Sequence, residues 1–286
     1  MAQTLTEIKA LLASHGLRPK HKFGQNFLHD GNHMGRMMEA AALREGDVVL
    51  EVGPGTGALT ERLLDAGAHV VAVEIDRDLE PILTQRIAEH QGDANDRFDL
   101  LVDDVLAGKH ELNRAVLKRV ASRSTGRGFK LIANLPYNVA SPLLINLAKL
   151  GPSDAPGLMT HAVVMLQKEV AQRIVAPPGG KEYGPLGILL QALYDCRTVG
   201  TLSPQCFWPA PKVASAVAAM VRRERPITAD FDALTDFTHR LFAARRKQLG
   251  SILGPDASWP EGINPQQRPE TLSVEQIEAL RALNRT

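Results

Sequence analysis

Five apolar runs alternate with helical segments between residues 47 and 167, and this alternation constrains the fold more than any other feature of the sequence. In order, the runs read DVVLEVG, HVVAVEID, FDLLVDDV, FKLIAN and HAVVMLQ. The segments between them, such as ALTERLLDAG and DLEPILTQRIAEH, carry apolar residues at helical spacing. Strands that alternate with helices form parallel sheets covered on both faces. We therefore expect an α/β fold.

The rest of the chain adds two β-like runs and a helical region. YDCRTVGTL and VASAVAAMV flank the Pro-rich PQCFWPAPK, which predicts two final strands joined by an ordered loop. Residues 107–128 predict a long connection, half helical and half flexible. The C-terminal sequence has a helical pattern and includes Ser273 with Gln276 at capping-box spacing. We predict two domains, residues 1–225 with the sheet and residues 226–286, a small all-helical domain.

Composition excludes several classes of protein. The apolar fraction is 44%, and no window reaches the ~20 uninterrupted apolar residues that cross a bilayer. Thr4 and Glu7 open an amphipathic helix rather than a signal peptide, so we expect a cytoplasmic protein without a membrane partner. Cys196 and Cys206 are the two cysteines, and they predict neither a disulfide framework nor a metal site. The net charge of +1 does not decide on a nucleic-acid partner.

The first strand runs directly into a glycine loop, EVGPGTGALT at residues 51–60. Gly53 and Gly55 let the backbone approach a ligand closely. Glu74 ends the second strand, 21 positions after Gly53, where a carboxylate can accept hydrogen bonds from both ribose hydroxyls. Strand, loop, helix and spaced acid together predict a cofactor that contains a nucleoside.

The spacing of the glycines bears on which cofactor binds. NAD enzymes carry G-x-G-x-x-G, whereas this loop reads G-x-G-x-G. Asp103 and Asp104 follow the third strand, where a carboxylate can meet an adenine amino group, an arrangement typical of S-adenosylmethionine sites. Either aspartate can instead cap the next segment. The pattern favours S-adenosylmethionine over NAD.

A second motif, NLPYN at residues 134–138, follows the fourth strand. The carboxyl ends of parallel strands are where open α/β sheets bind ligands. The Asn134 side-chain oxygen and the Leu135 main-chain oxygen can accept both N–H bonds of an exocyclic amino group, while Pro136 stiffens the turn. Tyr137 offers a stacking face for a base removed from its helix. This motif predicts methyl transfer to a base nitrogen, helped by hydrogen bonds that stabilise the transition state.

Phe207, in the sequence CFWP, is a candidate for the opposite wall of the base site. An aromatic residue in a Pro-rich loop is also often a hydrophobic plug. The catalytic residues expected are Asn134, Leu135, Pro136, Tyr137 and Phe207.

The sequence resembles the ribosomal RNA adenine dimethyltransferases, specifically the 16S rRNA adenine N6,N6-dimethyltransferase family. The resemblance runs nearly end to end. It is carried by FGQNFL at 23–28, EVGPGTGALT at 51–60, VEIDRDL at 73–79, DDVL at 103–106, NLPYNVASPLL at 134–144, MLQKEVAQRI at 165–174, YGPLG at 183–187, FWPAPKVASAV at 207–217 and ARRKQLGSIL at 244–253. Two positions depart from the family's usual residues, Ala214 in place of Asp and Gly250 in place of Asn.

The resemblance implies a class I S-adenosylmethionine-dependent methyltransferase sheet with an N-terminal lid of about residues 1–30. It implies dimethylation of two adjacent adenosines near the 3′ end of 16S rRNA, in the small ribosomal subunit or its precursor, and a role in biogenesis of that subunit. The implied cofactor-binding residues are Asn26, Leu28, Gly53, Gly55, Glu74, Asp104 and Asn134. The residues assigned to RNA binding are Arg222, Arg223, Arg245, Arg246 and Lys247.

Other functions remain open from sequence. A resistance-type relative methylates a large-subunit rRNA adenine with the same core motifs, and the stretch INPQQRPETLSVEQ favours the small-subunit enzymes. DNA or protein amide methyltransferases usually carry Pro-Pro in the middle of the related tetrapeptide, and Leu135 speaks against them. An inactive ribosome-assembly or transcription factor and a dehydrogenase are the remaining alternatives. Since no exposed apolar stripe suggests a partner helix, we expect a monomer.

Overall fold

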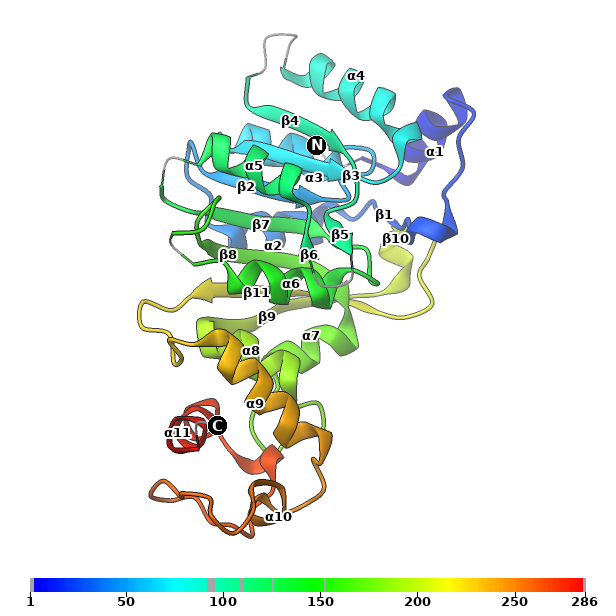
Figure 1. Ribbon diagram of the computed structural model, residues 1–286. Coiled ribbons are helices and arrows are strands. Elements are labelled where there is room, and N and C mark those ends of the chain that lie inside the picture. Colours follow the sequence, from blue (N-terminus) through cyan, green and yellow to red (C-terminus); the bar gives the residue numbers. More distant parts are fainter. Residues whose placement is uncertain (1–2, 92–95, 109–110, 125, 152, 285–286) are drawn as a thin grey trace. The chain divides into compact units, whose positions relative to one another are not determined.

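The computed structural model describes residues 3–91, 96–108, 111–124, 126–151 and 153–284 (Figure 1). The chain forms two compact units. Unit 1 comprises Met1–Lys168 and Thr198–Met220, and unit 2 comprises Glu169–Arg197 and Val221–Thr286. The boundary at residue 225 between a methyltransferase domain and a helical domain stays a prediction.

A seven-stranded sheet forms the centre of the fold, in the order β4-β3-β2-β7-β8-β11-β9. The pairs β4–β3, β3–β2, β2–β7 and β7–β8 are parallel. The alternating apolar runs are therefore strands, as predicted, and so are the two later runs. The strands are β2 (Val48–Val52), β3 (His69–Glu74), β4 (Phe98–Val102), β7 (Phe129–Asn134), β8 (Met159–Gln167), β9 (Tyr194–Leu202) and β11 (Ser215–Arg222).

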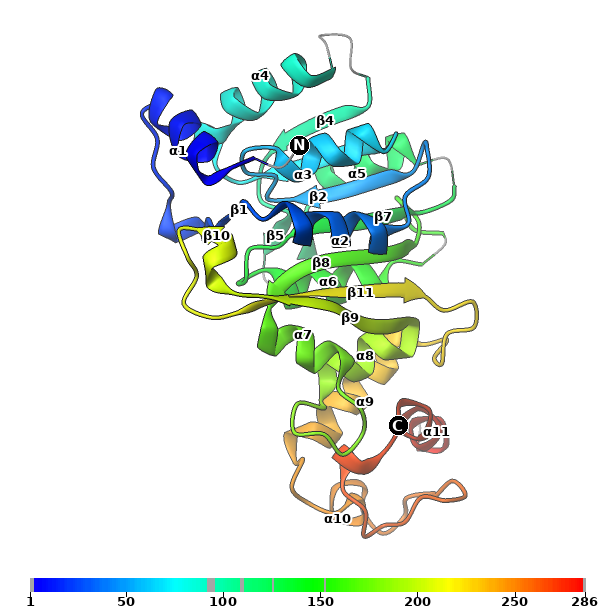
Figure 2. The same ribbon diagram turned by 180° about the vertical axis from the view of Figure 1, so that it is seen from behind.

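Helices cover both faces of the sheet in unit 1 (Figures 1 and 2). Helices α2 (Gly31–Ala41) and α3 (Ala58–Asp65) lie on one face, and α5 (Arg114–Arg123) and α6 (Ala140–Lys149) lie on the other. All five residues of β2 are buried, because the strand is central and covered from both sides. Helix α4 (Glu80–Gln91) connects β3 to β4.

The N-terminal segment is tied to unit 1 by apolar packing. Helix α1 (Leu5–Ser14) begins at the predicted capping box, in which Thr4 accepts from the Glu7 amide. A short 3-10 helix (His21–Phe23) leads to β1 (Phe27–Leu28), which pairs antiparallel with β10 (Phe207–Trp208). Ile8 and Leu12 of α1 pack in one cluster with Phe27, Leu79 and Ile82.

The long connection predicted at 107–128 is more ordered than expected. It contains part of β5 (Leu106–Gly108), which pairs antiparallel with β6 (Glu111–Leu112), and then α5. Asn113 explains the start of α5, because its side chain accepts from the Ala115 amide. Residues 109–110 and 125 of the predicted connection lie outside the described residues.

Unit 2 is mostly helical. Tyr183, fully buried, donates its hydroxyl to the Leu272 carbonyl at 2.9 Å and links the segment before α8 to the segment before the last helix. That last helix begins at the predicted capping box of Ser273 and Gln276. The helices are α7 (Lys168–Val175), α8 (Pro185–Leu193), α9 (Phe231–Ala243), α10 (Leu249–Leu253) and α11 (Val274–Leu283).

The segment of helical pattern around residues 231–253 forms two helices rather than one. Helix α9 ends at Ala243, and the chain turns before α10 begins at Leu249. Arg245 lies in this turn and donates to the carbonyls of Gly180 and Lys181, at 3.3 and 3.2 Å. These bonds tie the turn after α9 to the segment around residues 180–181.

Across the described residues, no helix combines the length and the apolar character needed to cross a membrane.

Candidate active site

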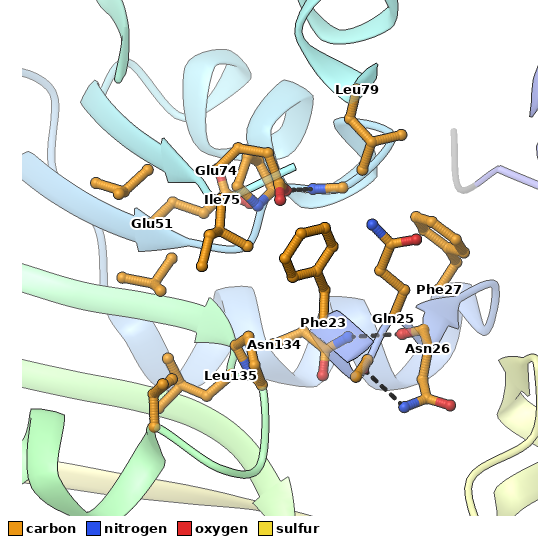
Figure 3. Close-up of a pocket in the computed structure, with 18 of the residues that line it drawn as sticks. Phe23, Gln25, Asn26, Phe27, Glu51, Glu74, Ile75, Leu79, Asn134 and Leu135 are labelled. Atoms are coloured by element: carbon orange, nitrogen blue, oxygen red, sulfur yellow. Dashed lines mark hydrogen bonds between the residues drawn. The ribbon is translucent and has the colours of Figure 1, made fainter. Parts of the chain in front are cut away.

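A cavity opens at the carboxyl ends of β2, β3 and β7 (Figure 3). Its walls come from residues 22–28, 51–56, 73–75, 103–105 and 134–139, together with side chains of neighbouring helices. Every cofactor-binding residue predicted from sequence lines this cavity, as do the four residues of the NLPY motif. Parallel strands place the segments after them at one edge, which explains how Gly53 and Asn134, 81 positions apart, line the same cavity.

The glycine loop is held tightly at Gly55. Its backbone has φ +60°, and its amide donates to the Glu74 carboxylate at 3.2 Å. A Cβ at this position would lie 3.1 Å from the Phe27 ring. The residue must therefore be glycine both for its backbone conformation and for the approach of the lid.

Glu74 ends β3 and is only 4% exposed. Its carboxylate accepts from the amides of Gly55 and Asp76, at 3.2 and 2.9 Å. Burial raises the pKa of Glu74 despite these bonds. A carboxylate has about four acceptor positions, so two hydroxyl groups of a ribose still have acceptors here.

A second acid, Glu51, was missed in the sequence reasoning. It is 1% exposed, lines the cavity beneath the glycine loop and accepts from the Thr60 hydroxyl at 2.8 Å. Burial, with a smaller contribution from the nearby Glu74 carboxylate, raises the pKa of Glu51 to about 8, although the hydrogen bond from Thr60 lowers it. An acid inside the apolar run DVVLEVG was the available signal.

Asn134 connects β7 to the N-terminal lid. Its side-chain Nδ2 donates to the main-chain carbonyl of Asn26 at 3.1 Å (Figure 3). Next to it, Leu135 is buried and donates its amide to the Met165 carbonyl on β8. This strand-like bond fixes the turn that presents the motif to the cavity.

Tyr137 is half-buried at the cavity wall. Its hydroxyl lies 2.7 Å from the Ser215 hydroxyl, which is fully buried at the start of β11. Burial raises the pKa of Tyr137, so the phenol stays neutral near pH 7. The ring is thus held in one orientation by a partner far away in sequence.

The lid is anchored by Asp76, a contact that sequence reasoning did not find. Lys20 and Gln25 both donate to its carboxylate, at 2.5 and 2.7 Å. Lys20 also pairs with Asp78, so this lysine binds two acids of its own chain. Figure 3 shows the Phe23 ring pointing into the same space as Ile75. Ile75 is 41% exposed although it lines the cavity.

A cavity that combines a glycine loop, a buried acid and the NLPY turn agrees with a sequence match to the ribosomal RNA adenine dimethylase family over residues 16–282. The chain belongs to this family. The family resemblance found in the sequence is therefore confirmed, and the chain is an S-adenosylmethionine-dependent rRNA adenine dimethyltransferase. A dehydrogenase is excluded.

Curated relatives of this dimethyltransferase match it over nearly its whole length. The ribosomal RNA small subunit methyltransferase A of Phenylobacterium zucineum is 40% identical over 277 residues, which cover 95% of this chain and 90% of the relative. The protein of the same name from Thermotoga maritima is 35% identical over 266 residues, covering 93% and 85%.

Two solved structures share its fold. A dimethyladenosine transferase from Plasmodium falciparum superposes with a TM-score of 0.70 at 22% identity, covering 89% of this chain and 95% of that one. The 23S rRNA methyltransferase ErmE superposes with a TM-score of 0.68 at 21% identity, covering 91% of this chain and 100% of that one. These likenesses confirm the methyltransferase fold class.

Phe207 of the dimethyltransferase lies in the core. It is 3% exposed, pairs with Leu28 between β10 and β1, and packs in an apolar cluster of unit 1. Among the described residues it is not part of the cavity wall. Its role as a wall of the base site stays a prediction, and the structure does not bring it together with Tyr137 at the cavity.

The five residues assigned to RNA binding have different surroundings in unit 2. Arg222 stacks on the Tyr194 ring at 5.1 Å, and Arg223 pairs with Asp195 at 2.9 Å. Arg245 pairs with Glu270 at 3.1 Å in addition to its two carbonyl bonds. Arg246 and Lys247 are exposed. The last two are thus the most accessible of the set.

One of the two departures from the family's usual residues has a structural explanation. Gly250 donates its amide to the Pro265 carbonyl at 2.9 Å, and a Cβ at this position would lie 3.1 Å from the Pro265 Cβ. A larger residue would require this loop of unit 2 to move. At the other position, the Ala214 carbonyl accepts from the Lys168 amide at 2.9 Å, a bond that does not depend on the side chain.

Asp30, His33 and Cys206 bring three possible metal-ligating groups within 4.8 Å of one another, outside the cavity. The Asp30 carboxylate caps α2 by accepting from the amides of Asn32 and His33, both at 3.0 Å. Helix capping explains its position without an ion.

Proposed function

We propose that this enzyme dimethylates N6 of two adjacent adenosines near the 3′ end of 16S rRNA, and that it acts in biogenesis of the small ribosomal subunit. The observation that carries the proposal is the turn at Asn134–Tyr137, fixed at the rim of a cavity that also contains the glycine loop and Glu74. The names of relatives at 35–40% identity support the small subunit as the target. We propose that the enzyme works in the cytoplasm as a monomer.

The residues of the cavity fit S-adenosylmethionine. Glu74 has acceptor positions for the two ribose hydroxyls, and the backbone beside Gly53 and Gly55 is open to the methionine part. Ile75 offers an apolar face to the adenine of the cofactor. Asp104 is exposed at the rim of the cavity, where the amino group of that adenine would lie. When bound, the cofactor supplies an electrophilic methyl group.

Asn134 and Leu135 would hold the target amino group. The Nδ2 of Asn134 is engaged by the lid, which leaves its Oδ1 as an acceptor for one N–H of the adenine. The Leu135 carbonyl would accept the other. Two such bonds favour the pyramidal nitrogen of the transition state and thus stabilise it more than the planar ground state.

Tyr137 would form a stacking wall for the extruded base. Its hydroxyl is fixed by Ser215, so the ring loses little freedom when a base packs against it. Stacking contributes ~1–3 kcal/mol per base, comparable with the cost of removing an adenine from its stack. Stacking on the aromatic ring therefore offsets the free-energy cost of extruding the base.

We propose that the helical domain, residues 226–286, recognises RNA. Arg246 and Lys247 carry positive charge on an exposed turn, and contacts to phosphate supply most sequence-independent affinity. Arg222, Arg223 and Arg245 are proposed to contribute from the same unit.

The test is transfer of labelled methyl groups from S-adenosylmethionine to unmethylated small ribosomal subunits, followed by nucleoside analysis and mapping of the modified positions. The expected result is N6,N6-dimethyladenosine at two adjacent positions near the 3′ end of 16S rRNA. Methylation of large-subunit RNA alone would overturn the proposed target. Tight subunit binding without any transfer would indicate an assembly factor. Light scattering at low concentration tests the monomer.

A further inference from the structure

Gln3 makes a two-point contact with the glycine loop. Its Nε2 donates to the Thr56 carbonyl at 3.1 Å, and its Oε1 accepts from the Thr56 hydroxyl at 2.6 Å. Both residues are only 3% exposed. Gln3 lies outside residues 16–282, the part of the chain that matches the family.

The loop needs such an anchor because of its glycines. Thr56 stands between Gly55 and Gly57, whose φ angles are +60° and +85°. Glycine has more backbone freedom than any other residue, so a segment flanked by two of them is costly to hold in one conformation. Helix α3 follows directly, and its N-cap Gly57 has no side chain with which to cap it. The two hydrogen bonds between the Gln3 side chain and Thr56 restrict the residue between the two glycines.

Helix α1 explains how residue 3 can act as an anchor. Ile8 and Leu12 are 0% and 2% exposed and pack against Leu79 and Ile82, next to the cavity. The Thr4–Glu7 capping box fixes the first turn of the helix immediately after Gln3. The glutamine is thus presented from a packed element rather than from a free terminus.

We propose that Gln3 is a positioning residue for S-adenosylmethionine: it holds the glycine loop in the conformation that binds the cofactor. Thr56 lines the cavity, whereas Gln3 reaches it only through Thr56. If the loop samples other conformations, the apparent Kd rises in inverse proportion to the binding-competent fraction. The inference rests on the proposed cofactor site.

The experiment compares Gln3→Met with wild type by calorimetric titration of S-adenosylmethionine. Methionine keeps the length of the side chain and removes both hydrogen bonds. Gln85→Met is the matched control, since Gln85 is an exposed glutamine on α4 of the same unit. We expect Gln3→Met to raise the Kd roughly 3- to 30-fold, corresponding to the partial loss of two buried hydrogen bonds. Gln85→Met should leave it within about twofold of wild type.

Three further readouts separate positioning from general stability. Hydrogen exchange of loop residues 53–57 in the ligand-free protein should accelerate in Gln3→Met. The KM for S-adenosylmethionine should rise while the KM for RNA stays unchanged. Thr56→Val, which removes only the hydroxyl bond to Gln3 and keeps the Thr56 carbonyl as an acceptor, should give an intermediate Kd and covers the case in which Gln3→Met does not fold.

An unchanged Kd in Gln3→Met, even with a lowered Tm, would overturn the inference, because Gln3 would then only stabilise the fold. If wild type itself does not bind S-adenosylmethionine, the proposed function fails instead. In that case the exchange of the ligand-free loop still decides whether Gln3 anchors it: unchanged exchange would overturn the anchoring as well.

Discussion

Asn134 donates its side-chain amide to the main-chain carbonyl of Asn26, 108 positions earlier in the chain, at 3.1 Å. This single bond joins the turn proposed to hold the target base to the lid proposed to cover the cofactor. It also sets the orientation of the amide, since Nδ2 faces the lid carbonyl and Oδ1 is left as the acceptor. Order in the lid and geometry at the reacting nitrogen are therefore coupled.

Asn134→Ala should abolish most methyl transfer without unfolding the protein. Removing one stabilising group from a transition state typically lowers the rate 10²- to 10³-fold, and we expect about that loss in kcat/KM. Asn146→Ala is the control, because Asn146 also donates its amide to a main-chain carbonyl in unit 1, that of Pro142 at 2.9 Å. Measured on small subunits, activity of Asn134→Ala within about threefold of the control would contradict the assigned role.

The buried Glu51 should make stability depend on pH. Burial, aided by the Glu74 charge, raises its pKa from 4.5 to about 8 in the folded protein. Between these values the folded state binds about one more proton at Glu51 than the unfolded state, so the contribution of Glu51 to stability should fall as pH rises, by up to about 1.4 kcal/mol per pH unit. Glu51→Gln is permanently neutral and should flatten this dependence.

Denaturant unfolding between pH 5 and 8 measures the effect of Glu51. Glu39→Gln, at an exposed glutamate on α2, controls for the loss of a carboxylate. Equal slopes in wild type and Glu51→Gln would show that Glu51 is ionised in the folded protein across this range.

Gly55→Ala should weaken cofactor binding, whereas a Gly→Ala change with similar backbone strain away from the cavity should not. At φ +60° any Cβ is strained, by roughly 1–2 kcal/mol, and here the Cβ would also press on the Phe27 ring at 3.1 Å. Gly46→Ala provides the comparison, since Gly46 has φ +80° with no atom within 4 Å of its Cβ. Both variants should lose similar backbone stability.

Thermal unfolding and calorimetric titration of S-adenosylmethionine distinguish the two glycine variants. We expect a raised Kd for Gly55→Ala and an unchanged Kd for Gly46→Ala. The same Kd in both would show that the lid adapts without cost when the Phe27 ring is displaced.

The basic turn after α9 should separate RNA affinity from stability. Arg246 and Lys247 are exposed, so replacing both by alanine should weaken RNA binding, reduce the slope of log K against log salt by about 1–2, and leave the Tm unchanged. Arg245→Ala should instead lower the Tm, because this side chain binds Glu270 and two carbonyls within unit 2. The measurement is filter binding across a salt series, beside thermal unfolding.

An Arg114→Ala/Lys118→Ala variant controls for loss of charge, since both residues are exposed on α5. If it weakens RNA binding as much as the Arg246→Ala/Lys247→Ala variant does, the effect reflects net charge rather than a site.

The sequence by itself determined the strands, most helices, the capping boxes at Thr4 and Ser273, and which residues, predicted to bind the cofactor, line the cavity. These follow from local periodicity and from motifs at strand ends, and parallel strands bring such ends to one edge whatever the details of packing. The family followed from the same motifs.

Only the tertiary structure decided which partner each polar or aromatic side chain meets. It took Phe207 into the core, tied Lys20 to Asp76 and Arg245 to Glu270, buried Glu51, and joined the buried Gln3 to Thr56 of the glycine loop. None of these contacts is local. Each joins segments at least 25 positions apart or depends on burial, and a short-range pattern carries no information about either.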